Sequence, residues 1–260
     1  MAIFETQNLA VGYAHGKQTT TLLSGLNLSL EAGQLVALLG QNGAGKSTLI
    51  RALTFATRPI EGKIMMRGVD ADTISKAQRA RLLGLVSTER IQAGALTVTE
   101  LVGLGRQPYT GFLGRLSDDD HAIVAESIAS VGMSHKAESF VANLSDGERQ
   151  KVMIARALAQ HTPIIVLDEP TAFLDAASRI ETMHLLASLA HEQGKAILLS
   201  THDISRSLLL CDQLWVITRD RRVLTGPTAQ MVHSEAMNEV FSNSSITFNP
   251  THCDYESTED

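Results

Sequence analysis

The sequence Gly40-Gln-Asn-Gly-Ala-Gly-Lys-Ser-Thr48 has the spacing of a phosphate-binding loop. It follows an apolar run at residues 34–39, which predicts a strand, and it precedes an apolar pattern at residues 49–53, which predicts a helix. In this order of strand, loop and helix, backbone N–H groups converge on a phosphate at the start of the helix. A chance glycine-rich turn is the alternative, and both flanking elements disfavour it.

The loop offers backbone groups and two side chains to a phosphate. Gly43 and Gly45 let the backbone curl around it. Lys46 supplies a cation for the β and γ phosphates, so we expect a catalytic role for it, and Ser47 offers its hydroxyl to Mg²⁺. The expected nucleotide-binding residues of the loop are Gly40, Asn42, Gly43, Ala44, Gly45, Lys46, Ser47 and Thr48.

Two further apolar runs predict an α/β fold. Residues 164–167 and 196–199 have the composition of strands that are buried on both faces of a parallel sheet. Between them, residues 178–193 predict a helix that Ser178 and Glu181 cap and that Gly194 ends. Strand, helix and strand in this order form a right-handed parallel unit, so we expect a mostly parallel, doubly wound sheet.

Two acids, Asp168 and Glu169, end the first of these runs. Strands of a parallel sheet carry ligand sites at their carboxyl ends, where Gly40 also lies. Adjacent residues of an extended strand point in opposite directions. We therefore expect Asp168 to face Mg²⁺ or its water, and Glu169 to act as general base on the attacking water. A solvated turn is the alternative, and the phosphate loop favours function.

The remaining patterns predict two additions to the core. Residues 3–30 alternate apolar and polar side chains, as in antiparallel strands, and form an N-terminal β subdomain. Residues 89–143 read as an inserted helical subdomain, with helix starts at Thr97 and Ser117 and stops at Pro108 and Gly132. We expect one domain over residues 1–260, in which approximately residues 1–88 and 144–260 form the catalytic core with the β subdomain. Smaller expected features are a short helix after Ser75, a hairpin of residues 214–217 and 223–225, and a tail that frays after Asn243.

Composition excludes several classes of protein. The chain has 260 residues, of which 44% are hydrophobic and 19% charged, which rules out a disordered, collagenous or coiled-coil chain. It contains no apolar run of about 18–20 residues and no signal peptide pattern, so we expect a cytosolic protein that does not cross the membrane. The net charge of −6 does not indicate a nucleic-acid partner, and Cys211 and Cys253 are too few for a disulfide framework.

Leu144-Ser-Asp-Gly-Glu-Arg-Gln150 precedes another predicted helix. Ser145-x-x-Glu148 is by itself a capping box, so a simple helix start is one interpretation. The other is an anion site that a second copy of the protein uses. Five motifs in this order resemble the nucleotide-binding subunit of an ATP-binding cassette (ABC) transporter, which has a P-loop NTPase core: the phosphate loop, Leu-Ser-x-Gly-Glu-Arg-Gln, Asp-Glu-Pro-Thr, Leu-Asp and Ser-Thr-His-Asp.

The resemblance implies a head-to-tail homodimer that holds two ATP. Each phosphate loop would face the signature of the other chain, in which Ser145 and Gly147 contact the γ-phosphate beside Asp146 and Glu148. His202 would sense the γ-phosphate and orient water, Asp175 would link the two sites, and Tyr13 would stack on adenine. The alternatives are a polar surface for His202, a helix cap for Asp175 and strand packing for Tyr13.

The sequence departs from the family at one functional position. The family usually has a glutamine that contacts Mg²⁺ and water where this chain has Thr88, with Glu89 next to it. A hydroxyl or a carboxylate can approach Mg²⁺, but neither has the reach and neutrality of an amide. The signature also has Asp146 and Glu148 at positions where Gly and Gln are common, and the first turn of a helix favours such acids.

Residues 97–111 are similar to importer subunits for iron-siderophore complexes, haem and cobalamin. The resemblance implies an ATPase on the cytoplasmic face of the membrane that powers uptake through a polytopic permease, with a periplasmic or surface substrate-binding protein as an indirect partner. Residues 97–111 would dock the permease, or they would simply pack against the core. A soluble ABC ATPase of DNA repair or ribosomes, an exporter subunit and, more remotely, a phosphate-loop kinase are the alternatives.

Overall fold

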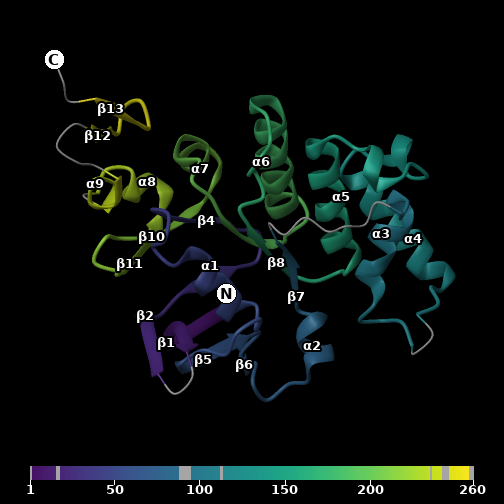
Figure 1. Cartoon of the computed structure of the whole chain (residues 1–260), viewed down its shortest axis with the longest axis horizontal. Helices are drawn as coiled ribbons and strands as arrows, with labels where there is room; N and C mark the ends of the chain where they lie inside the picture. Colours follow the sequence, from purple (N-terminus) through teal and green to yellow (C-terminus); the bar gives the residue numbers. More distant parts are fainter. Residues whose placement is uncertain are drawn as a thin grey trace.

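The computed structural model describes residues 2–15, 18–87, 95–111, 114–234, 236–241 and 246–257. Its main sheet has six strands in the order β11-β10-β4-β9-β8-β7 (Figure 1). All neighbouring strands are parallel except β10 and β11, which confirms the expected α/β fold with a mostly parallel sheet. The strands are β4 Leu35–Gly40, β7 Leu83–Val86, β8 Ile164–Asp168, β9 Ala196–Ser200, β10 Gln213–Ile217 and β11 Val223–Pro227.

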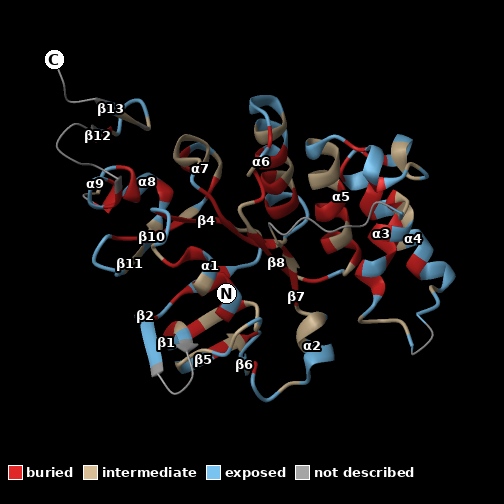
Figure 2. Cartoon of the chain, viewed as in Figure 1, coloured by how far each residue is buried: buried red, intermediate tan, exposed pale blue. Residues whose placement is uncertain are grey.

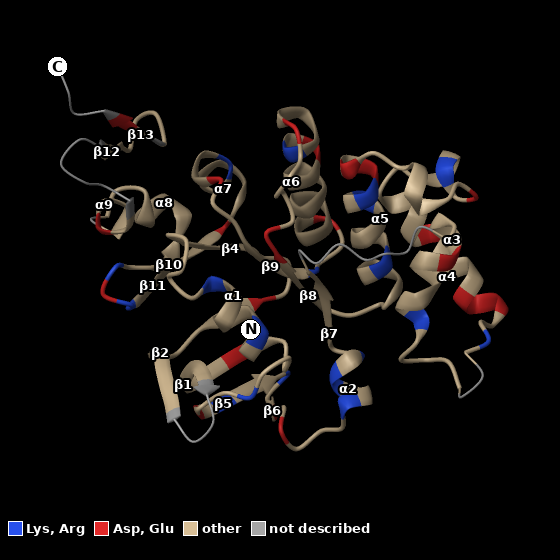
Figure 3. Ribbon diagram, in the orientation of Figure 1, with Lys and Arg blue, Asp and Glu red and all other residues tan. Residues whose placement is uncertain are grey.

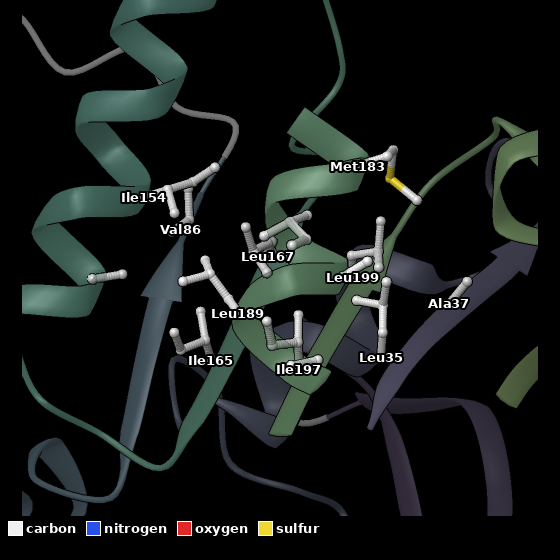
Figure 4. Close-up of a cluster of buried hydrophobic side chains, with 14 of the residues drawn as sticks. Leu35, Ala37, Val86, Ile154, Ile165, Leu167, Met183, Leu189, Ile197 and Leu199 are labelled. Carbon is white, nitrogen blue, oxygen red and sulfur yellow. The ribbon is translucent and has the colours of Figure 1, made fainter. Parts of the chain in front are cut away.

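Apolar side chains are buried on both faces of this sheet. Figure 2 colours much of its strands red, for buried residues. In β4, Leu35 and Leu39 belong to one hydrophobic cluster, whereas Val36 and Leu38 belong to the other. The first cluster includes residues of α5 Asp146–Ala159 and α6 Ala176–His191, and Figure 4 shows part of it. The second includes residues of α1 Lys46–Leu53. Burial on both faces explains why these strands are continuously apolar in sequence.

An antiparallel sheet lies beside the second cluster. It pairs β2 Gln18–Leu26 with β1 Ala2–His15, β1 with β5 Glu61–Met66, and β5 with β6 Val69–Asp70, while β3 Ser29–Glu31 also pairs with β1. The antiparallel strands expected over residues 3–30 are thereby confirmed. The apolar side chains that this sheet buries pack in the same cluster as β4, so the two sheets share one core.

Helices gather at one end of the molecule, where α3 Val98–Gly103 and α4 Asp118–Ser130 pack on α5 (Figure 1). The helix starts at Ser75, Thr97 and Ser117 are confirmed, because each side chain accepts a hydrogen bond from the backbone three residues on. Ser75 begins α2 Lys76–Ala80. Single turns of 3₁₀ helix are η1 Leu104–Arg106, η2 Ser134–Lys136 and η3 Val141–Asn143. The subdomain boundaries near residues 89 and 143 stay predictions.

Two predictions about local structure were wrong. The helix expected from Ser178 begins at Ala176, because the carboxylate of Asp175 accepts the Ser178 N–H at 2.8 Å and forms the cap. The tail does not fray over residues 246–257, where β12 Ile246–Asn249 pairs with β13 Asp254–Ser257. Phe248 is buried in the first cluster, and its ring lies 5.1 Å from that of Tyr255.

The other short helices are α7 Ile204–Leu210, α8 Thr228–Met231 and α9 Ala236–Phe241. Within the ranges that the structure describes, the helices are too short or too polar to cross a bilayer.

The segment of residues 104–109 packs tightly against the rest of the protein. The Arg106 guanidinium is buried and donates to Asp120 at 2.7 Å and to the carbonyl of Ala159 at 2.9 Å. A Cβ on Gly105 would lie 2.2 Å from the Arg156 carbonyl oxygen, so only glycine fits against α5. Arg81 donates to the carbonyl of Pro108. The packing interpretation of this segment is therefore confirmed for Gly105 and Arg106, and its docking role stays a prediction.

We expect Arg106→Met to destabilise the fold because it leaves Asp120 charged and without its buried partner. Hydrogen bonds from the Ser117 N–H and from Arg106 lower the pKa of Asp120 from 3.8 to about 2. The hydrogen bonds from Ser117 and Arg106 to Asp120 therefore stabilise the protein fully above the ordinary pKa of 3.8, and this stabilisation is lost as the pH falls toward about 2. At neutral pH the melting temperature should fall by roughly 5–10 °C.

Thermal unfolding followed by circular dichroism measures this effect. Arg115→Met is the matched control, since Arg115 is exposed in the same part of the chain. Equal melting temperatures for the two variants at neutral pH would show that the buried pair does not stabilise the fold.

Candidate nucleotide site

The phosphate loop connects β4 to α1 by a backbone that requires glycine. Gly45 has a φ of 114°, and a Cβ there would lie 2.7 Å from Cδ2 of Leu22. Its carbonyl accepts the Leu49 N–H at 2.8 Å, which starts the helix. Gln41 donates from Nε2 to the carbonyl of Val240 at 2.6 Å and so ties the loop to α9. The predicted loop between a strand and a helix is therefore confirmed.

The Lys46 ammonium lies inside the curve of this loop. It is buried and donates to the carbonyl oxygens of Gly40 at 2.8 Å and of Gln41 at 3.2 Å. Burial lowers the pKa of Lys46, while the nearby charges of Glu169 and Asp168 act in the opposite direction. A cation that is held in place beside a set of backbone N–H groups is suited to bind a phosphate.

A cleft of about 270 Å³ runs along the loop, and Tyr13 from β1 lies on its wall. The Tyr13 side chain is 56% exposed, so its ring is available to a flat ligand. Glu169 from the end of β8 and Arg221 from the β10–β11 hairpin line the same cleft. The structure thereby brings Tyr13 and Glu169 together with the predicted loop residues Asn42, Gly43, Gly45, Lys46, Ser47 and Thr48.

An adjoining cleft contains the other expected catalytic side chain, His202. Its wall is formed by Gly40, Gln41, Asn42, Glu169 and His202. His202 follows β9 and Glu169 follows β8, and these neighbouring strands are parallel, so their carboxyl ends meet at one edge of the sheet. Glu169 and Asn42 line both clefts, which places the expected general base between the phosphate loop and His202.

The backbone at Glu169 differs from the expected extended strand. Its φ is 47°, in the left-handed region, whereas β8 ends at Asp168. The Glu169 N–H donates to Ser200 Oγ at 2.9 Å, and the Ser200 hydroxyl donates to the Asp168 carboxylate at 2.6 Å. A tertiary contact thus sets the turn that separates the two acids, and the expected alternation of Asp168 and Glu169 along one extended strand is wrong.

Ser200 is a site residue that the sequence analysis missed. It is fully buried at the end of β9, directly opposite Asp168 in the sheet register. A serine that ends an otherwise apolar strand before Thr201-His202 is the only local signal, and such a residue is usually a turn residue. Its contact with both acids makes it a positioning residue for them.

The residues expected to hold Mg²⁺ are suited to that ion. Ser47 and Asp168 are both oxygen ligands, which a hard cation prefers, and Ser47 is exposed in the cleft. One Asp168 oxygen accepts the Ser200 hydroxyl, which fixes the orientation of the carboxylate. Among the described residues, no cluster of three or more His, Cys, Asp or Glu side chains could hold a metal alone. An ion held here would therefore take its remaining ligands from phosphate and water.

The signature residues lie apart from this site in the same chain. Ser145, Asp146, Gly147 and Glu148 form the start of α5, and the clefts that the described loop residues line do not include them. Ser145 Oγ accepts the Glu148 N–H, and the Glu148 carboxylate accepts the Ser145 N–H at 2.9 Å. This second hydrogen bond is the main reason that the pKa of Glu148 is lowered. The capping box is therefore confirmed, and the contact with a partner's phosphate stays a prediction.

Three other expected residues have different outcomes. Asp175 caps α6, so its local alternative is confirmed, and the Ser178 N–H lowers the pKa of its carboxyl. Its role across a dimer stays a prediction. Thr88 and Glu89 lie outside the described residues, and Ser87 before them lines a groove between α2, β7 and α5.

Comparison with known proteins assigns the family of this chain. The sequence model of the ABC transporter family matches residues 23–172, which are more than half of the 260 residues. The chain is 32% identical to the iron(3+)-hydroxamate import ATP-binding protein FhuC of Bacillus subtilis, over 93% of this chain and 88% of that protein.

Solved structures give the same result. One is a structure of an inward-facing ABC transporter of the metal-chelate type, which is 27% identical, with a TM-score of 0.80 over 92% of this chain and 89% of that chain. Another is the ATP-binding cassette MJ0796 as a dimer in a post-hydrolysis state with ADP and phosphate. It is 27% identical, with a TM-score of 0.74 over 86% of this chain and 98% of that chain.

Proposed function

The chain belongs to the ABC transporter family as an ATP-binding, ATP-hydrolysing subunit, and we propose that it powers the import of a metal chelate through a membrane permease. The observation that carries this proposal is the meeting of the phosphate loop, Glu169 and His202 in two adjoining clefts. The iron(3+)-hydroxamate import protein FhuC, together with the transporter of the metal-chelate type, favours an importer over an exporter or a soluble ATPase.

The proposed reaction is the hydrolysis of ATP to ADP and phosphate. The loop and Lys46 bind the β and γ phosphates, and Tyr13 stacks on adenine. Mg²⁺, held by Ser47 and Asp168, supplies charge neutralisation on the phosphate oxygens. Glu169 accepts a proton from the attacking water, and His202 orients that water beside the γ-phosphate. Ser200 keeps the two acids in their separate positions.

We further propose that two copies work as a homodimer. The exposed start of α5 has a positive helix end and the backbone N–H group of Gly147, which together suit an anion. Because Ser145 and Gly147 do not line the described clefts along the loop of their own chain, they would complete the site of a second copy. The dimeric cassette MJ0796 with ADP and phosphate supports this arrangement.

The permease would bind residues 97–111 and the adjoining groove between α2, β7 and α5, where Gly105 packs against Arg156. The groove has a volume of about 470 Å³, and three basic residues, Lys76, Arg79 and Arg156, contribute to its walls. It lies beside Ser87, directly before the altered positions Thr88 and Glu89. A subunit that binds here acts as a peripheral protein on the cytoplasmic face of the membrane, and a substrate-binding protein contacts only the permease.

We expect tagged Glu169→Gln to recover a polytopic permease from detergent-solubilised membranes of the source cells in the presence of Mg²⁺ and ATP. The variant should retain ATP and hold the assembled state. Mass spectrometry of the recovered complex identifies the partner, and ATPase stimulation by an added ferric chelate in vesicles containing the recovered permease and its binding protein tests the cargo. Recovery of the homodimer alone, while a control transporter stays intact in the same detergent, would argue for a soluble ATPase.

A further inference from the structure

The hairpin between β10 and β11 brings an arginine to the nucleotide cleft. Basic and acidic residues gather on its loop, as Figure 3 shows. Arg221 in this loop lines the cleft that also contains Tyr13, Lys46 and Ser47. It also lines an adjoining cleft whose wall includes residues 41–44 of the phosphate loop. The hairpin lies next to the loop because β10 is the parallel neighbour of β4.

Arg221 occupies a backbone position that favours glycine. The Arg221 N–H donates to the Thr218 carbonyl at 3.0 Å, which closes a tight turn, and Arg221 itself has a φ of 64°. A turn followed by one left-handed residue is a common hairpin loop, and glycine is preferred at its left-handed position. An arginine there is strained, and a strained residue beside a ligand site suggests a function for its side chain.

Arg221 and Arg222 of this loop differ in their partners. Arg222 donates to Asp220 at 2.5 Å and to Glu239 at 3.2 Å. Arg221 is exposed and makes no side-chain hydrogen bond or ion pair with the residues that the structure describes. Its guanidinium is therefore available to a ligand in the cleft, whereas that of Arg222 holds the hairpin to α9.

A nucleotide bound in this cleft brings negative charge that a further cationic side chain would balance. Asp168 and Glu169 lie near Lys46, which is the buried cation among the described residues that line the cleft. A bound triphosphate therefore adds negative charge that Lys46 and a Mg²⁺ at Ser47 and Asp168 would balance only in part. We propose that Arg221 is a second cationic side chain, besides Lys46, that binds the phosphate groups of the nucleotide. This inference rests on the proposed nucleotide site and adds a binding residue to it. A guanidinium suits phosphate because its N–H groups donate in pairs to two oxygens.

Arg221→Gly tests the inference without damaging the turn, because glycine is the residue that the turn favours. We expect its affinity for ATP to fall about five- to tenfold at low ionic strength, the size of a charged hydrogen bond at a partly exposed site. The loss should be smaller for AMP and should shrink in high salt, since it comes from charge. Arg221→Lys keeps the positive charge but not the paired donors, so its loss should be smaller than that of Arg221→Gly. Titration calorimetry with ATP and AMP at two salt concentrations measures these values.

Arg67→Gly is the matched control, because Arg67 has a φ of 50° in the β5–β6 turn and is not among the residues that line the nucleotide clefts. It should bind ATP like the parent. Unchanged ATP affinity in Arg221→Gly, or the same loss in Arg67→Gly, would overturn the role of Arg221 while the parent still binds ATP. A loss that is equal for ATP and AMP and insensitive to salt would overturn the electrostatic role. A parent that binds no ATP would overturn both this inference and the proposed function.

Discussion

Glu169→Gln should lower ATP turnover by about 10²–10⁴-fold while ATP stays bound. Glu169 lines both clefts, and its carboxylate makes no hydrogen bond with the described residues. One oxygen of Asp168, in contrast, accepts the Ser200 hydroxyl. Glu169 is therefore the acid whose carboxylate is available to accept a proton from water. Glutamine has the same shape but no basic oxygen, and it removes a negative charge beside the phosphates. ATP affinity should be equal or higher, and an ATP-bound dimer should accumulate.

Phosphate release, ATP titration and light scattering after size-exclusion chromatography measure these three outcomes. Glu192→Gln is the control, since Glu192 is exposed at the end of α6 and is not part of the clefts that the loop residues line. Near-normal turnover in Glu169→Gln would exclude a general-base role. Loss of ATP binding together with turnover would instead show that Glu169 acts in binding.

The phosphate loop and the helix starts could be predicted because their signals are local. Gly45 needs a left-handed backbone, and Ser75, Thr97 and Ser117 each find the partner of their capping box three residues away. Such requirements appear directly in the residue types. The continuous apolar character of β4, β8 and β9 likewise follows from burial on both faces of the sheet.

The errors occurred where distant residues decide the structure. The turn at Glu169 depends on Ser200, which is 31 residues away in sequence. The hairpin of residues 246–257 has polar composition, but the Phe248 N–H donates to Asn238 Oδ1 at 3.0 Å and the Tyr255 hydroxyl donates to the Met237 carbonyl. These contacts with α9 hold the hairpin in place, although its sequence contains no local signal for strands. The prediction of where α6 begins was wrong for another reason. Asp175 and Ser178 are both good caps, and each has a polar residue three positions later.

The nucleotide site was predictable in its parts but not in its assembly. The motifs of residues 40–48, 168–169 and 202 meet because parallel strands place their carboxyl ends at one edge. Arg221 has no motif, and only the pairing of β10 with β4 brings its hairpin beside the loop. Its position in a turn that favours glycine became informative once the backbone was known.

Lys46→Ala should lower ATP affinity by at least about 100-fold, because it removes a buried cation whose charged hydrogen bonds to phosphate are each worth about 1.5–3 kcal/mol. The ammonium is already held inside the loop by the carbonyls of Gly40 and Gln41. Little side-chain entropy is therefore lost when phosphate binds, and a mobile surface lysine would contribute less. Titration of ATP into the purified variant measures the affinity, and its hydrolysis rate should fall accordingly.

Lys195 provides a control that separates a loss of phosphate binding from a loss of stability. Lys195 also donates to a backbone carbonyl, that of Thr162 at 2.9 Å, and burial lowers its pKa as it does for Lys46. It directly precedes β9 and thus lies at the amino end of the sheet, away from the clefts. Lys195→Ala should therefore lose comparable stability but keep its ATP affinity. If both variants kept ATP affinity, the loop would not bind phosphate through Lys46, and if both lost it equally, the effect would come from a weakened fold rather than from the site.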